Sequence, residues 1–154
     1  MQAVRRRDAT VLHHAPARET NAVAPVTRNP AYQAFLILRS GFTVAPILFG
    51  LDKFTALLTD WTKYLAPVFP QTIGVSPAVF MKGVGVIEIV AGLLVAIVPR
   101  FAAYVVAAWL LLIIVNLLIL GQYFDVALRD FGLMVGAIAL ARLAQGVHDW
   151  KARS

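Results

Sequence analysis

A glutamate near the middle of a long apolar segment constrains this chain more than any other feature. The segment Val79–Val98 is twenty residues long and almost wholly apolar. At about 1.5 Å of rise per residue, a helix of that length reaches about 30 Å, the thickness of a bilayer's hydrocarbon core. A carboxylate at the depth of Glu88 costs roughly 2.5–3.5 kcal/mol on insertion scales, so another group must compensate it. The sequence therefore predicts a transmembrane helix that carries a polar group.

The composition supports a membrane protein. The chain is 60% hydrophobic and 14% charged, whereas soluble domains are nearer half apolar and a quarter charged. It contains no cysteine, which excludes disulfides, thiolate metal sites and cysteine-ligated iron–sulfur clusters. The net charge of +6 need not indicate nucleic acid binding, because the placement of the basic residues relative to a membrane is more informative. We therefore expect a lipid bilayer, and no nucleic acid, as a partner.

Three more apolar segments have lengths that suit membrane spans. The short turn of Pro99 and Arg100 makes the second and third spans antiparallel neighbours. The pattern predicts an all-α polytopic membrane protein, a four-transmembrane-helix bundle. The spans that accompany Val79–Val98 are Ala31–Leu51, Phe101–Leu120 and Phe131–Val147.

The segment between the first two spans has an amphipathic pattern. Its apolar residues recur from Phe54 to Leu65 at spacings that share one face of a helix. Trp61 and Tyr64 are residue types favoured at membrane surfaces. We predict an interfacial helix anchored by these two side chains, followed by a loop over Gln71–Pro77. An amphipathic connector packed on the bundle is the alternative.

The placement of basic residues predicts an orientation. With four spans, nine basic residues lie on the side of the two termini and four on the other side. The positive-inside rule then places both termini in the cytoplasm, in a multi-pass protein of the plasma (inner) membrane. We expect a disordered basic arm over residues 1–29, a transmembrane domain over 30–148 and a polar tail over 149–154. We expect His13 and His14 to be solvated and His148 to be an interfacial histidine, and none of the three to be a metal ligand.

Two ions of opposite sign lie at similar predicted depths. Arg39 lies about 12 Å, and Glu88 about 15 Å, from the cytoplasmic ends of their spans at helical rise. We predict that they pair within the membrane. A purely structural pair and a pair that borders a ligand site both remain open. Trp109 and Asn116 are the residues that would help to line such a site.

Two further groups of residues are candidates for contacts between helices. Glycines allow the backbones of two helices to approach closely; they are Gly85, Gly92, Gly132 and Gly136. Charged residues near the ends of the spans predict a polar cluster at the outer rim, with interfacial anchoring as the alternative. The members of this cluster are Asp52, Lys53, Lys82, Asp125, Arg129 and Asp130.

Three short motifs, in this order, resemble one known family. They are LRSGFTVAPILFGLDKF with the following WTKYLAP, then GVIEIVAGLL, and then ALRDFGLMVGAIAL. The layout is similar to the DoxX-like family of small four-helix membrane proteins over about residues 32–143. The resemblance implies a four-helix membrane fold, and relatives that include a subunit of thiosulfate:quinone oxidoreductase and proteins of redox or oxidative-stress systems. Family membership fixes architecture better than activity.

Three functions remain open. The first is an accessory or structural subunit of a membrane complex, such as a respiratory or redox complex, with other subunits or a second copy as partner. It is favoured because the sequence contains no recognisable catalytic constellation, so we expect no catalysis by the chain alone and no cofactor of its own. The alternative, implied by the resemblance, is a quinone-linked oxidoreductase subunit with a quinone between the helices. A small transporter is the third.

Overall fold

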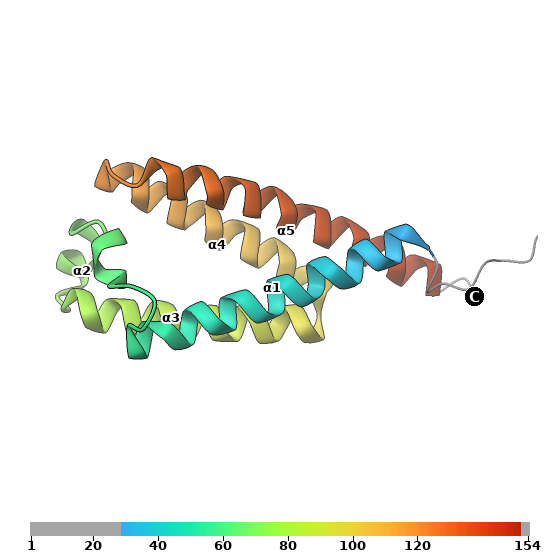
Figure 1. Cartoon of the computed structure of the whole chain (residues 1–154), viewed down its shortest axis with the longest axis horizontal. Helices are drawn as coiled ribbons and strands as arrows, with labels where there is room; N and C mark the ends of the chain where they lie inside the picture. Colours follow the sequence, from blue (N-terminus) through green and yellow to red (C-terminus); the bar gives the residue numbers. More distant parts are fainter. Residues whose placement is uncertain (1–28, 152–154) are drawn as a thin grey trace, which may run out of the picture.

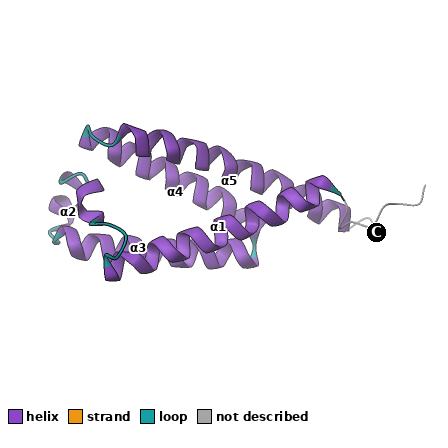
Figure 2. Cartoon of the chain, in the orientation of Figure 1, coloured by secondary structure: helices purple, strands orange, loops and turns teal. Residues whose placement is uncertain are grey.

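The described part of the chain is a bundle of four long helices with two short helices in one connection. The computed structural model describes residues 29–151, so the predicted basic arm up to residue 28 and the last three residues lie outside it. Figure 2 shows helices and connections only, and no strand occurs within residues 29–151. The long helices are α1 (Pro30–Thr55), α3 (Pro77–Ile97), α4 (Pro99–Leu120) and α5 (Phe124–Lys151), and the short ones are η2 (Trp61–Tyr64) and α2 (Val68–Ile73).

Proline marks the start of three of the long helices. Pro30, Pro77 and Pro99 each stand at the first turn, where the missing N–H costs nothing and the fixed φ favours a helix. Two of these starts are also capped by side chains. Asn29 accepts a hydrogen bond from the Ala31 N–H, and Ser76 accepts one from the Val79 N–H.

Glycines set the contact between α1 and α3. A Cβ added at Gly50 would lie 2.6 Å from the carbonyl oxygen of Gly85, and one added at Gly92 would lie 2.7 Å from the carbonyl oxygen of Thr43. Larger side chains would separate these backbones, so the two helices form one close pair. The contacts also fix the register of the pair. Gly50 faces Gly85 and Thr43 faces Gly92, so residues whose numbers add to about 135 lie opposite each other.

Alanines set the contact between α4 and α5, which form the second close pair. Ala103 on α4 and Ala137 on α5 are fully buried, as are Leu140 and Ala141. This contact belongs to a core cluster to which α1 adds Phe35 and α3 adds Val95. In Figure 1 the two pairs lie close together at the end of the bundle where α5 ends, and they diverge toward the end that carries α2.

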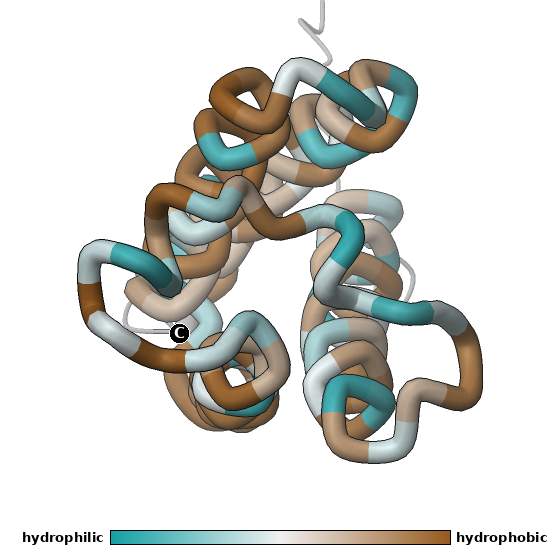
Figure 3. Tube along the Cα trace, turned by 90° about the vertical axis from the view of Figure 1, so that its left-hand side faces the viewer, coloured by the Kyte–Doolittle hydropathy of each residue, from teal (hydrophilic) through white to brown (hydrophobic). Residues whose placement is uncertain are grey.

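The outward faces of the helices are apolar. Ile37 is 72%, Ile97 74% and Phe101 62% exposed, which suits contact with lipid. In Figure 3 apolar residues run along the helices, while hydrophilic residues gather in the connections nearest the viewer. Three helices, α1, α3 and α4, are long and apolar enough to cross a membrane. The span predicted over residues 131–147 lies within α5, and its crossing stays a prediction.

The connection between α1 and α3 differs from the predicted interfacial helix. Helix α1 continues to Thr55 and ends at Ala56, whose φ of 52° is left-handed. The chain then bends, forms the single 3₁₀ turn η2 and, within the predicted loop, forms α2, which ends at Gly74 with a φ of 75°. The segment with the amphipathic pattern that predicted one helix instead folds over the end of the bundle.

The last helix is also longer than predicted. It begins at Phe124, inside the expected loop, and continues to Lys151, past the expected start of the polar tail. Gly121 ends α4 with a φ of 71°, and Tyr123 is left-handed with a φ of 58°. Two left-handed residues reverse the chain within this short connection, so α5 begins earlier than the hydropathy indicated.

Replacing Gly85 by alanine tests the close contact between α1 and α3. The new Cβ would lie 2.6 Å from the Gly50 carbonyl oxygen, and such overpacking costs about 1–3 kcal/mol. We expect Gly85→Ala to lower the thermal midpoint of the detergent-solubilised protein. The matched control is Gly83→Ala on the same helix, where an added Cβ meets nothing within 4 Å. Equal effects of the two substitutions would contradict the contact.

Candidate functional site

A buried ion pair joins α1 to α3. Lys53 Nζ lies 2.6 Å from Glu88 Oε2, and the two side chains are only 3% and 11% exposed. A buried charge is tolerated when a partner of opposite sign and hydrogen bonds replace its lost hydration. Lys53 is therefore the compensating group that Glu88 requires.

This pairing corrects the predicted pair of Arg39 and Glu88. That prediction assumed that the spans end level with each other. In the structure the glycine contacts offset the helices, so that about eight residues of α1, roughly 12 Å at helical rise, extend past the end of α3. Glu88 consequently lies opposite the later part of α1, about two turns from Arg39.

Arg39 instead caps the end of α3. Its guanidinium donates a hydrogen bond to the carbonyl oxygen of Ala96, in the last turn of that helix. The last four carbonyls of a helix have no partner within it, and a cation there also interacts favourably with the helix dipole. The Phe35 ring lies beside the guanidinium, with its centroid 5.9 Å from Cζ. The arginine thus has a structural role of its own.

Asp52 holds the start of the connection after α1. Its carboxylate accepts hydrogen bonds from the backbone N–H groups of Leu57 and Leu58 and, at 2.7 Å, from the indole N–H of Trp61. With the Thr55 hydroxyl, which donates to the same group at 3.2 Å, four donors converge on one buried carboxylate, so the chain turns tightly around it. We call residues 56–66 the strap. The binding of Trp61 to Asp52 is the physical reason why this segment does not continue as a surface helix.

Trp61 covers the ion pair. Lys53 Nζ lies 3.9 Å from the centroid of the Trp61 ring, a cation–π contact that strengthens when it is shielded from water. The Trp61 ring also packs edge-on against Phe49, with 5.9 Å between the centroids. Trp61, predicted as an anchor at the membrane surface, therefore closes the site over Lys53.

Asn116 holds the other end of the strap. Its side-chain oxygen accepts a hydrogen bond from the Ala66 N–H at 2.9 Å, and its amide donates one to the Tyr64 carbonyl at 2.6 Å. The Tyr64 ring packs against Tyr123, with 4.7 Å between centroids. Asn116, predicted as a ligand-lining residue, is engaged with the backbone. The strap is consequently tied to α1 by Asp52 and to α4 by Asn116.

Helices α4 and α5 each add one group near the ion pair. The indole N–H of Trp109 on α4 is buried and makes no hydrogen bond of ordinary geometry, although the Glu88 carboxylate lies close enough to interact with it. Asp130 on α5 is buried and lies within electrostatic range of Lys53 and Glu88. Each long helix therefore contributes one residue to what we call the polar centre: Lys53, Glu88, Trp109 and Asp130.

The predicted outer-rim cluster divides into four parts. Asp52, at the end of α1, holds the strap, and the adjacent Lys53 belongs to the polar centre. Arg129, with its side chain 60% exposed, forms an ion pair of 2.9 Å with its neighbour Asp130. Asp125 lies in the first turn of α5, where a negative charge complements the helix dipole. Lys82 is exposed beside a hollow of about 210 Å³ whose wall includes Lys53, Asp60 and Trp61.

The predicted packing glycines also differ among themselves. Gly85 and Gly92 lie at close approaches to α1, and Gly136 lies beside the Phe42 ring of α1. A Cβ added at Gly132 would meet nothing within 4 Å, so this position faces away from the described helices. Sequence reasoning missed Gly50, the partner of Gly85, although it stands one turn before Lys53.

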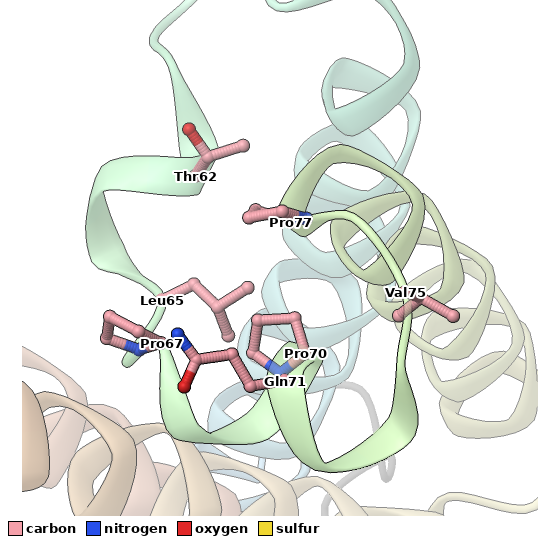
Figure 4. A pocket seen from close by; sticks show the side chains of 7 residues that line it. All are labelled: Thr62, Leu65, Pro67, Pro70, Gln71, Val75 and Pro77. Atoms are coloured by element: carbon pink, nitrogen blue, oxygen red, sulfur yellow. The ribbon is translucent and has the colours of Figure 1, made fainter.

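A second hollow lies under the connection from the strap to α3. Its volume is about 290 Å³, and Figure 4 shows side chains of the strap, of α2 and of the start of α3 around it. Prolines form much of the wall, so its shape is fixed by the backbone. The residues around it are Thr62, Leu65, Pro67, Pro70, Gln71, Val75 and Pro77.

No metal-ligating group is found within residues 29–151, where no three His, Cys, Asp or Glu side chains lie together in a suitable arrangement. His148, in the described part, lies 3.6 Å from Asp149 at the exposed end of α5. His13 and His14 lie outside the described residues. Comparison of the chain with protein-family models, curated proteins and solved structures finds no match.

A double-mutant cycle tests the Lys53–Glu88 pair. Glu88→Gln and Lys53→Met should each destabilise the protein by about 3–5 kcal/mol, because each leaves one buried ion unpaired. The double substitution should cost clearly less than the sum of the two. Thermal unfolding in detergent measures all three variants. Additive losses would contradict the pair. Arg39→Gln is the control, and its loss should simply add to that of Glu88→Gln.

We expect the strap to respond to pH through ionisation of the Asp60 carboxylate. Its carboxylate accepts hydrogen bonds from the hydroxyl and the N–H of Thr62, and these hold the pKa of Asp60 below its usual value. The ionised form is thus favoured in the folded state. Its stabilising contribution is complete above the unfolded pKa of about 3.9 and is lost as the pH falls through the lower folded pKa.

NMR detection of the Thr62 amide measures this response. We expect its chemical shift to titrate with a midpoint below pH of about 3.9 in the native protein, and Asp60→Asn to abolish the titration. A midpoint at or above that value would show that the hydrogen bonds do not favour the carboxylate.

Proposed function

We propose that this chain is a four-span integral membrane protein and serves as an accessory or structural subunit of a membrane complex. The resemblance to DoxX-like proteins supports this, and a redox or respiratory complex is the assembly that it implies. Helix α5 would provide the fourth crossing, since it packs along α4 over most of its length. Both termini would then lie in the cytoplasm, and the strap on the outer side of the plasma (inner) membrane.

The observation that carries this proposal is how the buried polar groups are used. Lys53 and Glu88 neutralise each other, Asp52 is occupied by three donors from the strap, and Asn116 is occupied by two backbone groups of the strap. These side chains stabilise the arrangement of the helices. A bundle whose polar side chains are engaged in internal contacts is suited to be a scaffold. Its partner subunit would then carry the catalytic groups.

The apolar outer faces supply surface for such a partner. Exposed residues such as Leu48, Val86 and Leu128 lie on three different helices, so lipid, another subunit or a second copy of the chain can pack against them. Helices in a bilayer associate through close packing and not through a hydrophobic driving force. Gly132, which faces no described side chain, offers one place for such close packing on α5.

A quinone-linked subunit is the second candidate, and one observation favours it. The Trp109 N–H is buried without a normal hydrogen bond beside the Lys53–Glu88 pair. Buried donors in native structures nearly always have an acceptor. A quinone carbonyl between the helix pairs would supply one, with Trp109 and Lys53 as donors.

Native mass spectrometry of the protein, extracted gently from its own membranes, distinguishes the two functions. We expect a stoichiometric protein partner and no retained quinone, because Lys53 and Glu88 already neutralise each other and Asp52 and Asn116 are bonded to the strap. A quinone that stays with the wild type and is lost from Trp109→Phe, which removes only the N–H, would establish the second candidate. Trp150→Phe at the exposed end of α5 is the matched control. A chain with neither partner nor quinone would contradict both functions.

A further inference from the structure

Two arginines lie at the end of the bundle opposite the strap and are not bonded to a carboxylate. Arg100 is the second residue of α4, and its guanidinium lies over the neighbouring Phe101 ring, 4.4 Å from the centroid. Arg142 on α5 donates a hydrogen bond of 3.0 Å to the side-chain oxygen of Gln145. Neither arginine forms an ion pair within residues 29–151. The third arginine of this end, Arg39, is already bonded to Ala96.

Polar side chains link Arg142 on α5 to Tyr104 on α4, one turn from Arg100. The Gln145 amide donates a hydrogen bond of 3.4 Å to the Tyr104 hydroxyl, so these residues lie side by side. Arg100 precedes Tyr104 by four residues and Arg142 precedes Gln145 by three, spacings that place each pair on one face of its helix. Because Arg142 bends toward Gln145, its charge is directed toward the helix end and away from the membrane centre.

An apolar stripe begins beside this polar group. Phe101, Tyr104, Val105 and Leu112 on α4 are all exposed and follow the spacing of one helix face. The stripe runs from the end of α4 that carries Arg100 toward the middle of a helix long enough to cross a membrane. The surface therefore has cationic hydrogen-bond donors at the membrane boundary and an apolar track directly below them.

We propose that this surface, formed by Arg100, Tyr104, Arg142 and Gln145, binds the headgroup of an anionic phospholipid. The two guanidinium groups would bind the phosphate oxygens, for which arginine geometry is well suited. An acyl chain would lie along the stripe on α4. The charge of this end favours an anionic lipid, because three arginines, Arg39, Arg100 and Arg142, outnumber Asp149, the one carboxylate near it within residues 29–151. This inference is independent of the proposed function.

Lipid titration in native mass spectrometry tests the proposal. The detergent-solubilised full chain is titrated with phosphatidylglycerol and, separately, with phosphatidylcholine carrying the same acyl chains. We expect phosphatidylglycerol to be bound more tightly. Each of Arg100→Gln and Arg142→Gln should weaken its binding about fivefold, the equivalent of roughly 1 kcal/mol per arginine near a lipid surface. Lys82→Gln, at an exposed lysine of the opposite end, is the matched control and should leave the binding unchanged.

Three results would overturn the proposal. Equal binding of the two lipids would show that the surface does not select an anionic headgroup. An equal loss in Lys82→Gln would show attraction by the overall charge and not by this surface. Effective competition by inorganic phosphate would assign the arginines to a free anion. If one arginine variant fails to fold, the other variant decides alone, because each arginine is expected to contribute separately.

Discussion

The arrangement of this bundle depends on the compensation of one buried charge. Glu88 requires a cation at its own depth, and Lys53 meets that requirement because the glycines of α1 and α3 let the helices approach closely and fix their offset. Lys53 can in turn stay buried because Trp61 covers it. Trp61 is held by Asp52, which immediately precedes Lys53 in the chain. The register, the ion pair and the fold of the strap therefore support one another.

The strap also connects two units that otherwise meet mainly at their far ends. Helices α1 and α3 form one close pair and α4 and α5 the other, each through small side chains. Asp52 ties the strap to the first pair and Asn116 ties it to the second. A side chain that satisfies both a donor and an acceptor of a buried backbone avoids two desolvation costs, each about 1–3 kcal/mol if unmet. Asn116 thus satisfies two backbone groups of the strap with one side chain and links the strap to α4.

The sequence predicted the helical class and three of the apolar spans because length and hydropathy are local properties. It also indicated that Glu88 needs a partner. It did not identify Lys53, because the choice depends on the offset of two helices, and that offset is set by Gly50 and Gly85 from different parts of the chain. The pairing with Arg39 followed from the simpler assumption that the helices end level.

The strap was mispredicted for a related reason. Its apolar residues repeat with helical spacing, but the hydrogen bonds of Asp52 and a left-handed Ala56 end the helix first. The available signal was Asp52 near the start of this segment, with the indole N–H of Trp61 nine residues later as a side-chain donor to it. Asn116 was expected to help to line a ligand site, and nothing in the sequence showed that its partners would be backbone groups about fifty residues earlier.

The overhang of α1 past α3 has a mechanical consequence. Its Phe35 reaches the core cluster that also contains Ala141 and Ala144 of α5, while Phe42 lies beside Gly136. Helix α1 thus joins its own pair to α5 on the side of the overhang, and the strap joins the two pairs at the other end of the bundle. Any change in the angle between the pairs acts as a lever about the anchored end. Over a lever arm of about 30 Å, the length of a twenty-residue helix, a tilt of roughly 1° displaces the strap end by about 0.5 Å. The packing at the overhang therefore also sets how far the strap, with the Trp61 ring over Lys53, stands from α4.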